Sequence, residues 1–285
     1  MKSRSPSLHP IFERFEPFND PVPAGFAVDF LGVKRQAKFT NVVPGSCSDY
    51  PPADDDIFEW IDVLESVAEA QGSYTMMELG AGYGCWSVRA ATACRILHPD
   101  ISVRLVLVEP EPTHFEWISE HFRDNGLDPS AQTLIQAALS DAPGERLFYT
   151  RRLGKDSSAA DWYGQALAEE PPIDSEAYDA TMVQCVTLSD VLSQMPFGTI
   201  DLVDMDLQGQ EEIVIRSAIE QLTQRAKRLH IGTHSRAIEA GLQSILNAHG
   251  WRCLIDYPCM RQHDTPYGLI RFVDGVQTWV NPLVL

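Results

Sequence analysis

The sequence predicts an α/β fold in which helices cover both faces of a mostly parallel sheet. Short apolar runs alternate with amphipathic segments from about residue 73 onward, an order that buries a parallel sheet between two helical layers. The first run ends in Glu78 and opens into a turn with glycines at 80, 82 and 84, and the second ends in Glu109. Ligands of open parallel sheets bind at the carboxyl ends of the strands. These residues therefore predict a nucleoside-bearing cofactor at that edge.

Residues 1–52 are predicted to form an N-terminal extension that packs on a main domain of residues 53–285. The extension is rich in Pro, Phe and Gly, and its strand-like stretch is FAVDFLGVKRQAKF. A first helix is expected after the acidic triplet Asp54 to Asp56, because carboxylates there cap a helix and suit the positive end of its dipole. The apolar face of this helix consists of Ile57, Ile61, Leu64 and Ala68.

The remaining elements follow the same alternation. Strands are expected at residues 75–78, 103–108, 133–139, 145–149, 199–207, 226–234, 251–257 and 268–275. Further helices are expected at residues 88–97, 113–124, 210–224 and 235–250, and residues 183–195 form a strand followed by a short helix. In the helix at 210–224, the residues expected to face inward are Ile213, Ile219 and Leu222.

Residues 151–181 show no clear periodicity and are predicted to form an insertion or lid. A loop of this length in a compact domain is usually functional or mobile. Trp162 and Tyr163, together with nearby hydroxyl side chains, provide a surface that could bind a sugar or a ring system. We expect these two aromatic residues to bind substrate, and a mobile linker is the alternative.

Composition narrows the classes of partner. The net charge is −18, which repels phosphate backbones, so we expect no nucleic-acid partner. The sequence has no apolar run long enough to span a membrane and no secretory signal, so no membrane association and a cytoplasmic location are expected. The six cysteines form no CxxC pair, which indicates reduced thiols and argues against a zinc site.

The spacing of the glycines distinguishes between cofactors. A dinucleotide fingerprint requires GxGxxG, whereas here Cys85 stands where its third glycine would fall. A phosphate-binding P-loop is excluded because no Gly-Lys-Ser/Thr follows. An acid ahead of GxGxG, with Glu109 closing the next strand, fits S-adenosylmethionine better. Glycines that serve only to pack the turn, and a nicotinamide-dependent oxidoreductase, are the alternatives.

Five segments resemble the FkbM-type methyltransferases, class I S-adenosylmethionine-dependent enzymes that mostly methylate hydroxyl groups of sugars and natural products. The segments are ELGAGYG, VLVEPEPTHFEW, AALSDAPG, TLSDVL and IDLVDMDLQGQEE, and the resemblance extends from Phe58 to Trp251. It implies a Rossmann-like, seven-stranded sheet with an antiparallel C-terminal strand. Family members usually have Asp-x-Glu-Gly in the last segment, whereas this chain has Asp206 and Gln208 before Gly209. Loss of that acid makes a non-catalytic cofactor-binding protein a further alternative.

The resemblance also implies which residues bind S-adenosylmethionine. Glu109 is expected on the ribose hydroxyls and Glu78 near the methionine amino group. Ala137 and Ala138 are expected against adenine. The turn residues assigned to the cofactor are Gly80, Ala81, Gly82, Tyr83 and Gly84, and Asp206 is assigned to it as well. An aromatic face of Tyr83 or Trp86 could contact the sulfonium, although ordinary packing explains both side chains equally well.

The acceptor side is assigned to residues at the ends of two later strands. Asp206 and His234 are expected to meet at the cleft rim as catalytic residues, with His234 near neutral pKa as the general base. Capping of the following helix is the alternative role for His234. Gln208 is expected to bind substrate by hydrogen bonding. Asp204 alternates with Asp206, but a turn or solvent role is favoured for the pair, and no metal is expected.

Together these observations predict an S-adenosylmethionine-dependent O-methyltransferase that releases S-adenosylhomocysteine. The acceptor is expected to be a hydroxyl of a small molecule, a sugar or a natural-product precursor, and a homo-oligomer is left open. His114 and His121 flank the helix after Glu109 and are expected at the surface.

Overall fold

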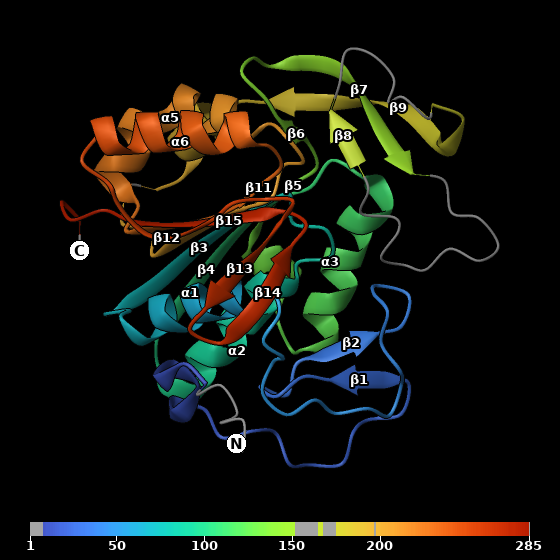
Figure 1. Cartoon of the computed structure of the whole chain (residues 1–285). Helices are drawn as coiled ribbons and strands as arrows, with labels where there is room; N and C mark the ends of the chain where they lie inside the picture. Colours follow the sequence, from blue (N-terminus) through green and yellow to red (C-terminus); the bar gives the residue numbers. More distant parts are fainter. Residues whose placement is uncertain (1–7, 152–164, 168–174, 197, 285) are drawn as a thin grey trace.

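The central element is a mostly parallel sheet. The computed structural model describes residues 8–151, 165–167, 175–196 and 198–284. Within them, seven strands form one sheet (Figure 1). From edge to edge they are β12 (Arg252–Tyr257), β15 (Gly275–Val280), β11 (Arg228–Thr233), β10 (Leu202–Met205), β3 (Ser73–Leu79), β4 (Ser102–Val108) and β5 (Thr133–Ile135). Only β15 runs antiparallel to its neighbours, so the predicted fold class is confirmed.

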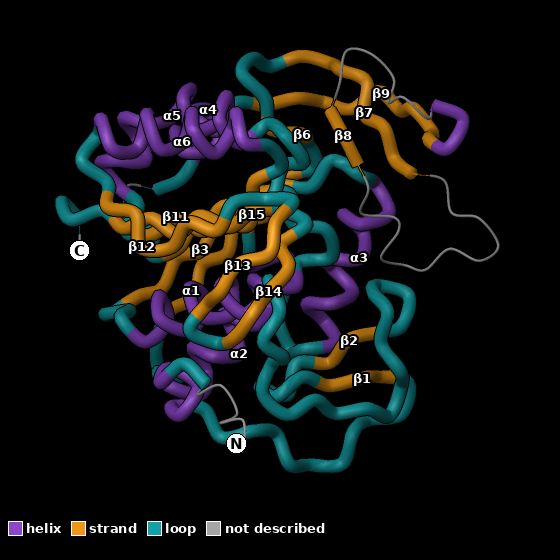
Figure 2. Tube along the Cα trace, in the orientation of Figure 1, coloured by secondary structure: helices purple, strands orange, loops and turns teal. Residues whose placement is uncertain are grey.

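Helices cover both faces of this sheet, as Figure 2 shows. One layer consists of α1 (Ile57–Ala68), α2 (Cys85–Leu97) and α3 (Pro112–Asp124), and the other of α4 (Leu188–Gln194), α5 (Glu211–Arg225) and α6 (Arg236–Ala248). Successive strand residues point to opposite faces. Met76 therefore packs in the core with α1 and α2, whereas Met77 packs with the second layer.

The same alternation places a row of polar residues on the face toward α1. Glu78, Asp204, His230 and Thr278 are register partners on β3, β10, β11 and β15. All four side chains are buried. The row crosses the sheet near the carboxyl ends of the parallel strands, which is the edge where the sequence predicts a ligand.

A second, four-stranded sheet replaces part of the predicted insertion. Its order is β6 (Ala138–Leu139), β9 (Tyr178–Val186), β7 (Gly144–Arg151) and β8 (Gln165–Leu167), with the 3-10 turn η4 (Ser175–Ala177) before β9. Much of β9 is exposed, so it lacks the apolar alternation that would reveal it in the sequence, and pairing with β7 defines it instead. Trp162 and Tyr163 lie outside the described residues.

The N-terminal segment lies against α1 and α3. It contains the 3-10 turn η1 (Pro10–Arg14) and a hairpin of β1 (Phe26–Val28) and β2 (Lys34–Gln36). A further 3-10 turn, η2 (Pro129–Ala131), lies outside this segment and follows α3. Phe12, Phe15 and Phe30 are buried in the same core as α1. The Lys34 backbone N–H donates to Asn125 Oδ1 at 2.8 Å, and Asn125 Nδ2 donates back to the Lys34 carbonyl at 3.0 Å.

The C-terminal pairing differs from the prediction. The sequence predicts that residues 251–257 and 268–275 form a terminal pair of strands. Instead, β12 pairs with β15, and β14 (Gly268–Phe272) forms a separate hairpin with β13 (Arg261–Thr265). The main sheet is completed by β15, in which every residue is buried. The polar residues of β15 hide it in the sequence. Gln277 donates from Nε2 to Asp256 Oδ1 at 3.1 Å, and the Thr278 hydroxyl donates to the buried Asp62.

Two local predictions are wrong. Ile213 is 39% exposed, and the inward face of α5 carries Val214 and Ile215 in addition to the predicted Ile219 and Leu222. Asp56 occupies the N-cap of α1, but within the described chain its side chain makes no capping hydrogen bond, because its backbone is already helical.

Among the described residues, no helix combines the length and apolar composition that a membrane crossing requires.

Candidate functional site

The glycine turn after β3 is shaped by close backbone packing. Gly80, Gly82 and Gly84 all have positive φ, a region that other residues rarely adopt. A Cβ atom on Gly80 would lie 1.8 Å from the Asp206 carbonyl oxygen, and one on Gly84 would lie 2.9 Å from Leu107 Cδ2. Packing therefore explains two of the glycines. Gly82 lines two adjoining cavities, which leaves room for a ligand at that point.

Two buried carboxylates hold this turn. Glu78 accepts hydrogen bonds from the backbone N–H groups of Trp86, at 3.2 Å, and Ser87, at 2.8 Å, in the first turn of α2. Glu109 accepts from Gly82 N–H at 2.7 Å and from Glu111 N–H at 2.8 Å. Burial raises the pKa of each to about 8, although the backbone hydrogen bonds oppose that rise.

The smaller cavity, of about 590 Å³, is lined mainly by apolar side chains. Its apolar lining includes Val108, Ala137, Ala138, Leu139, Phe148 and Leu167. Its polar lining side chains, among the described residues, are those of Glu109, Asp206, Gln208 and Gln210. Gln208 has a φ of 52° and donates from Nε2 to Asp206 Oδ1 at 2.8 Å. Gln208, which the sequence assigns to substrate, thus lies beside the residues assigned to adenine and ribose.

The larger cavity, of about 1540 Å³, is open to solvent and strongly acidic. The carboxylates among its described lining residues are Asp55, Asp56, Glu59, Glu78, Asp204, Asp206 and Asp274. Arg35, Arg89 and His230 are the basic residues among them. Gly80, Gly82 and Asp206 line both cavities, so a single extended ligand could occupy the two.

Asp206 and His234 meet at the rim, as predicted. His234 Nε2 lies 3.3 Å from Asp206 Oδ1, and His234 Nδ1 lies 2.8 Å from Glu211 Oε1. Desolvation favours a neutral His234, but the two carboxylates outweigh it and raise its pKa to about 10. Desolvation likewise opposes ionisation of Asp206, yet His234 and Gln208 lower the pKa of that carboxyl. His234 is therefore an imidazolium at neutral pH, unlike the near-neutral histidine that the sequence predicts.

Glu211 is a site residue that sequence reasoning missed. Besides His234, its Oε1 accepts hydrogen bonds from the backbone N–H groups of Leu207 and Gly209, both at 3.0 Å. These contacts hold the loop after β10, which carries Asp206 and Gln208. The position of Glu211 at the start of a helix was the only signal available, and it equally suggests a capping role.

The aromatic residues of the turn line the larger cavity but are also packed. Tyr83 stacks on Phe39, with ring centroids 5.3 Å apart, and donates from its hydroxyl to Cys85 Sγ at 3.0 Å. The Arg89 guanidinium lies 4.1 Å from the ring centroids of both Trp60 and Trp86. The cation stacked on Trp86 thus belongs to the protein itself. The predicted sulfonium contact stays a prediction for both aromatic residues.

His114 and His121 are buried, so the prediction of surface positions is wrong. Burial lowers their pKa values to about 4 and about 3, respectively, which keeps both rings neutral. His121 Nδ1 lies 3.2 Å from the Tyr83 carbonyl oxygen. His121 thus contacts the glycine turn, whereas the ring of His114 packs beside Trp117, with ring centroids 5.3 Å apart.

The sequence did not predict that residues before β3 line the larger cavity. Arg35 and Thr40 come from the N-terminal segment, and Asp55, Asp56 and Glu59 come from the start of α1. Arg35 Nε is buried and has no hydrogen-bond partner among the described residues. The acidic triplet was visible in the sequence, but nothing local indicated that it faces a cavity formed by residues far along the chain.

The residues present fit S-adenosylmethionine. Glu109 accepts two backbone hydrogen bonds and retains lone pairs for the ribose hydroxyls. The apolar slot beside Ala137 and Ala138 suits a flat adenine ring. The acidic larger cavity favours the positive ammonium and sulfonium groups of the methionine part.

Comparison with known proteins assigns the family. The Methyltransferase FkbM domain matches residues 89–244. A relative from Jannaschia sp. (strain CCS1) is 28% identical over 284 residues, which cover 94% of this chain and 96% of the relative. That relative is named as a methyltransferase, and its name states no acceptor.

Two solved structures are similar at low identity. A methyltransferase FkbM from Methylobacillus flagellatus KT is 13% identical with a TM-score of 0.44, over 80% of this chain and 56% of that one. A precorrin-6y C5,15-methyltransferase from Geobacter metallireducens GS-15 is 12% identical with a TM-score of 0.43, over 82% and 91%. The family assignment rests on the domain match. Because that match covers more than half of the chain, the protein belongs to the FkbM methyltransferase family and is an S-adenosylmethionine-dependent methyltransferase.

Proposed function

We propose that this methyltransferase transfers the methyl group to a hydroxyl of a neutral or positively charged small molecule or sugar precursor. The observation that carries the proposal is that the two cavities join at Gly80, Gly82 and Asp206. A donor whose nucleoside lies in the smaller cavity would direct its methyl group into the larger one. The larger cavity would then hold the acceptor.

The cofactor would be bound largely by residues that the turn already positions. Glu109 would accept hydrogen bonds from the ribose hydroxyls, and Ala137, Ala138 and the neighbouring apolar side chains would enclose adenine. The remaining turn residues and Glu78 would contact the methionine part. When bound, S-adenosylmethionine supplies an electrophilic methyl group for an in-line displacement. Alignment of donor and acceptor can contribute ~7–11 kcal/mol toward such a reaction.

The charge of the larger cavity supports the proposed class of acceptor. Its carboxylates outnumber its basic groups, and they would repel an anionic molecule such as a sugar phosphate. Hydroxyl and amino groups hydrogen-bond well to carboxylates. Arg35 would bind the methionine carboxylate or an electronegative group of the acceptor, since its Nε lacks a partner among the described residues.

We assign proton acceptance to Asp206. Its pKa is lowered, so the carboxylate is ionised at neutral pH, and it lies at the junction of the two cavities. His234 cannot accept a proton while it is an imidazolium. Its proposed role is to position Asp206 and keep it charged, with Glu211 holding the imidazolium from the other side.

The test is an acceptor screen with isotopically labelled methyl donor, followed by mass spectrometry of the product. With an acceptor in hand, Asp206→Asn is expected to lower kcat by about 10²–10⁴-fold, the usual contribution of general base catalysis. His234→Gln should lower kcat less and alter the pH profile of kcat, which a purely structural role would not do. The exposed Asp128→Asn serves as the matched carboxylate control.

Two results would contradict this proposal. If both Asp206→Asn and His234→Gln leave turnover intact, the residue assignment is wrong. If the labelled methyl group is found on nitrogen or carbon in the product, the assignment to hydroxyl acceptors is wrong while the residue roles remain open to the same measurement.

A further inference from the structure

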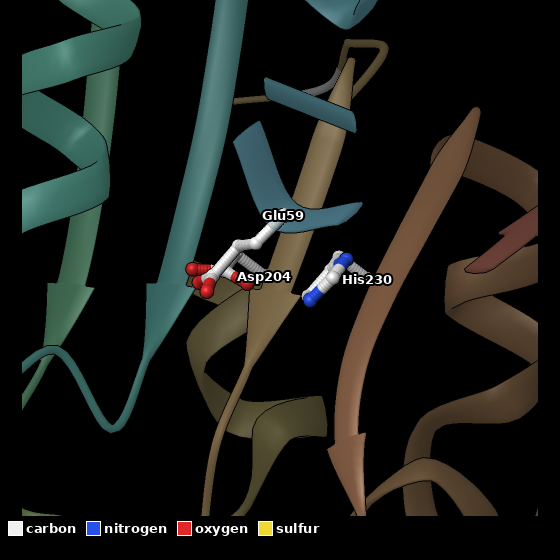
Figure 3. A group of neighbouring side chains, drawn as sticks. All are labelled: Glu59, Asp204 and His230. Atoms are coloured by element: carbon white, nitrogen blue, oxygen red, sulfur yellow. The ribbon is translucent and has the colours of Figure 1, made fainter. Parts of the chain in front are cut away.

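Three potential metal ligands converge in the wall of the larger cavity (Figure 3). Glu59 comes from α1, Asp204 from β10 and His230 from β11. One carboxylate oxygen or imidazole nitrogen from each lies within 4.8 Å of those of the other two. Asp204 is 5% exposed and His230 is 3% exposed, whereas Glu59 is half-buried. The cluster is therefore built into the protein and still borders the cavity.

The fold holds these residues in place through regular elements. Asp204 and His230 are register partners on adjacent parallel strands, so their side chains leave the sheet side by side. Glu59 lies on the helix that covers this face of the sheet. Ligands on helices and strands are positioned more rigidly than ligands on loops.

A second carboxylate orients the histidine. His230 Nδ1 donates a hydrogen bond to Asp62 Oδ2 at 2.8 Å, which leaves Nε2 as the nitrogen for a ligand. Asp62 is fully buried and is held in turn by Arg228 Nη1, at 2.8 Å, and by the Thr278 hydroxyl. Metal-binding histidines commonly donate their other ring N–H to a carboxylate, and this contact fixes the ring and its tautomer.

Without a cation, the cluster places two acids together in a poorly solvated position. A bound cation would remove this repulsion, since it favours the ionised form of both carboxylates.

We propose that Glu59, Asp204 and His230 bind a divalent metal ion in the wall of the acceptor cavity. Two carboxylates and one imidazole suit Mn²⁺, Fe²⁺ or Zn²⁺ better than Mg²⁺, which prefers oxygen ligands throughout. Three protein ligands leave coordination positions for water or for the acceptor. Resting on the proposed function, the role we assign to the ion is to coordinate the acceptor hydroxyl and lower its pKa.

The test titrates the metal-free full-length chain with Mn²⁺ and follows the electron paramagnetic resonance signal of the free ion. We expect one saturable site per chain, with binding below about 1 mM. Asp204→Asn and His230→Gln should each weaken binding by about tenfold or more. Asp55→Asn is the control, because it removes the same charge from the same cavity outside the cluster, and should leave the affinity nearly unchanged.

Thermal unfolding separates loss of the site from loss of the fold. The conservative Glu59→Gln keeps the size of the side chain and removes one acid from the buried pair, so the metal-free variant should unfold at a temperature equal to or above that of the wild type. Added Mn²⁺ should raise the unfolding temperature of the wild type but not that of Glu59→Gln.

Three outcomes decide between the proposals. Absence of Mn²⁺ binding up to about 1 mM overturns the metal site. Equal weakening by Asp55→Asn and Asp204→Asn overturns it as well, because it indicates diffuse attraction to an acidic cavity. Specific Mn²⁺ binding with no methyl transfer to any hydroxyl supports the metal site while contradicting the proposed function. Calorimetry with S-adenosylhomocysteine on each variant checks that the cofactor site is intact.

Discussion

The two cavities that meet at the glycine turn are built in different ways. The smaller one is apolar, and much of its lining comes from the ends of β3 and β4 and from the residues that follow β5. The larger one is acidic. It shares the end of β3 and the glycine turn, and it adds the start of α2, the N-terminal segment, α1, β10, β11 and the residues around the start of β15. Much of the smaller cavity, to which we assign the cofactor, thus lies at strand ends that the sequence marks. The larger cavity, to which we assign the acceptor, adds segments that no local pattern connects.

This difference bears on how the site can change. The cofactor side relies on backbone geometry, namely positive φ and N–H groups that donate to Glu78 and Glu109. Few side chains would satisfy the same geometry. The acceptor side relies on side chains that protrude into open space, so substitutions there alter charge and shape without disturbing the turn.

The largest expected effect comes from breaking the junction between the cavities. Gly80→Ala should lower the free energy of unfolding by roughly 3 kcal/mol or more, because it combines a strained positive φ with a clash against the Asp206 carbonyl oxygen. Gly72→Ala is a matched control with a similar φ and open space around the added atom, and should cost only about 1–2 kcal/mol. Urea unfolding measures both. Equal costs would mean that the turn can move away from β10.

The next largest effect separates the cofactor side from the acceptor side. Glu109→Gln should weaken S-adenosylhomocysteine binding by about 1.5–3 kcal/mol, or roughly 10–150-fold, because an amide replaces the acceptor of the Gly82 N–H and ribose hydrogen bonds. Asp274→Asn changes a carboxylate of the larger cavity and should have little effect on this affinity. Calorimetry provides both values. A similar loss in the two variants would show that the division between the cavities is not functional.

The smallest effect is a pH dependence of the free energy of unfolding that comes from His234. The folded-state pKa of His234 is about 10, above the unfolded value near 6.5, so its contribution is complete below about pH 6.5 and disappears as the pH rises through about 10. Without screening, this pKa difference corresponds to about 3 kcal/mol between pH 6.5 and 9. Because the Asp206 side chain is 56% exposed, solvent screens the pair, and wild type should lose roughly 1–2 kcal/mol more of its free energy of unfolding than His234→Gln. Urea unfolding across this range measures the difference. Parallel profiles would mean that His234 is not held as an imidazolium.

The predicted elements reflect the same division between local and distant information. The turn with Glu78, the acid Glu109 and the pairing of Asp206 with His234 were all found from strand ends, because parallel strands bring their carboxyl ends to one edge. In contrast, β9 and β15 were missed or misplaced. Their exposed or polar residues hide the alternation, and pairing partners far along the chain define them.

The sequence also failed to predict that certain polar side chains are buried. His114 and His121 lie on α3 among charged residues, so their pattern suggested a surface, yet the aromatic cluster under the glycine turn encloses them. Glu59 gave no signal at all, because its importance depends on Asp204 and His230, which lie about 145 and 170 residues away. Sequence spacing cannot report such a distance.

The amino-acid order alone therefore predicted the α/β fold, the glycine turn with Glu78 and Glu109, and the meeting of Asp206 with His234, because these follow from short-range periodicity and from the direction of parallel strands. The acidic larger cavity, the charge state of His234 and the cluster of Glu59, Asp204 and His230 emerged only once the chain was folded. Their properties depend on desolvation and on charges from separate elements. Desolvation and the interaction between charges depend on distances in space, which bear no relation to separation along the chain.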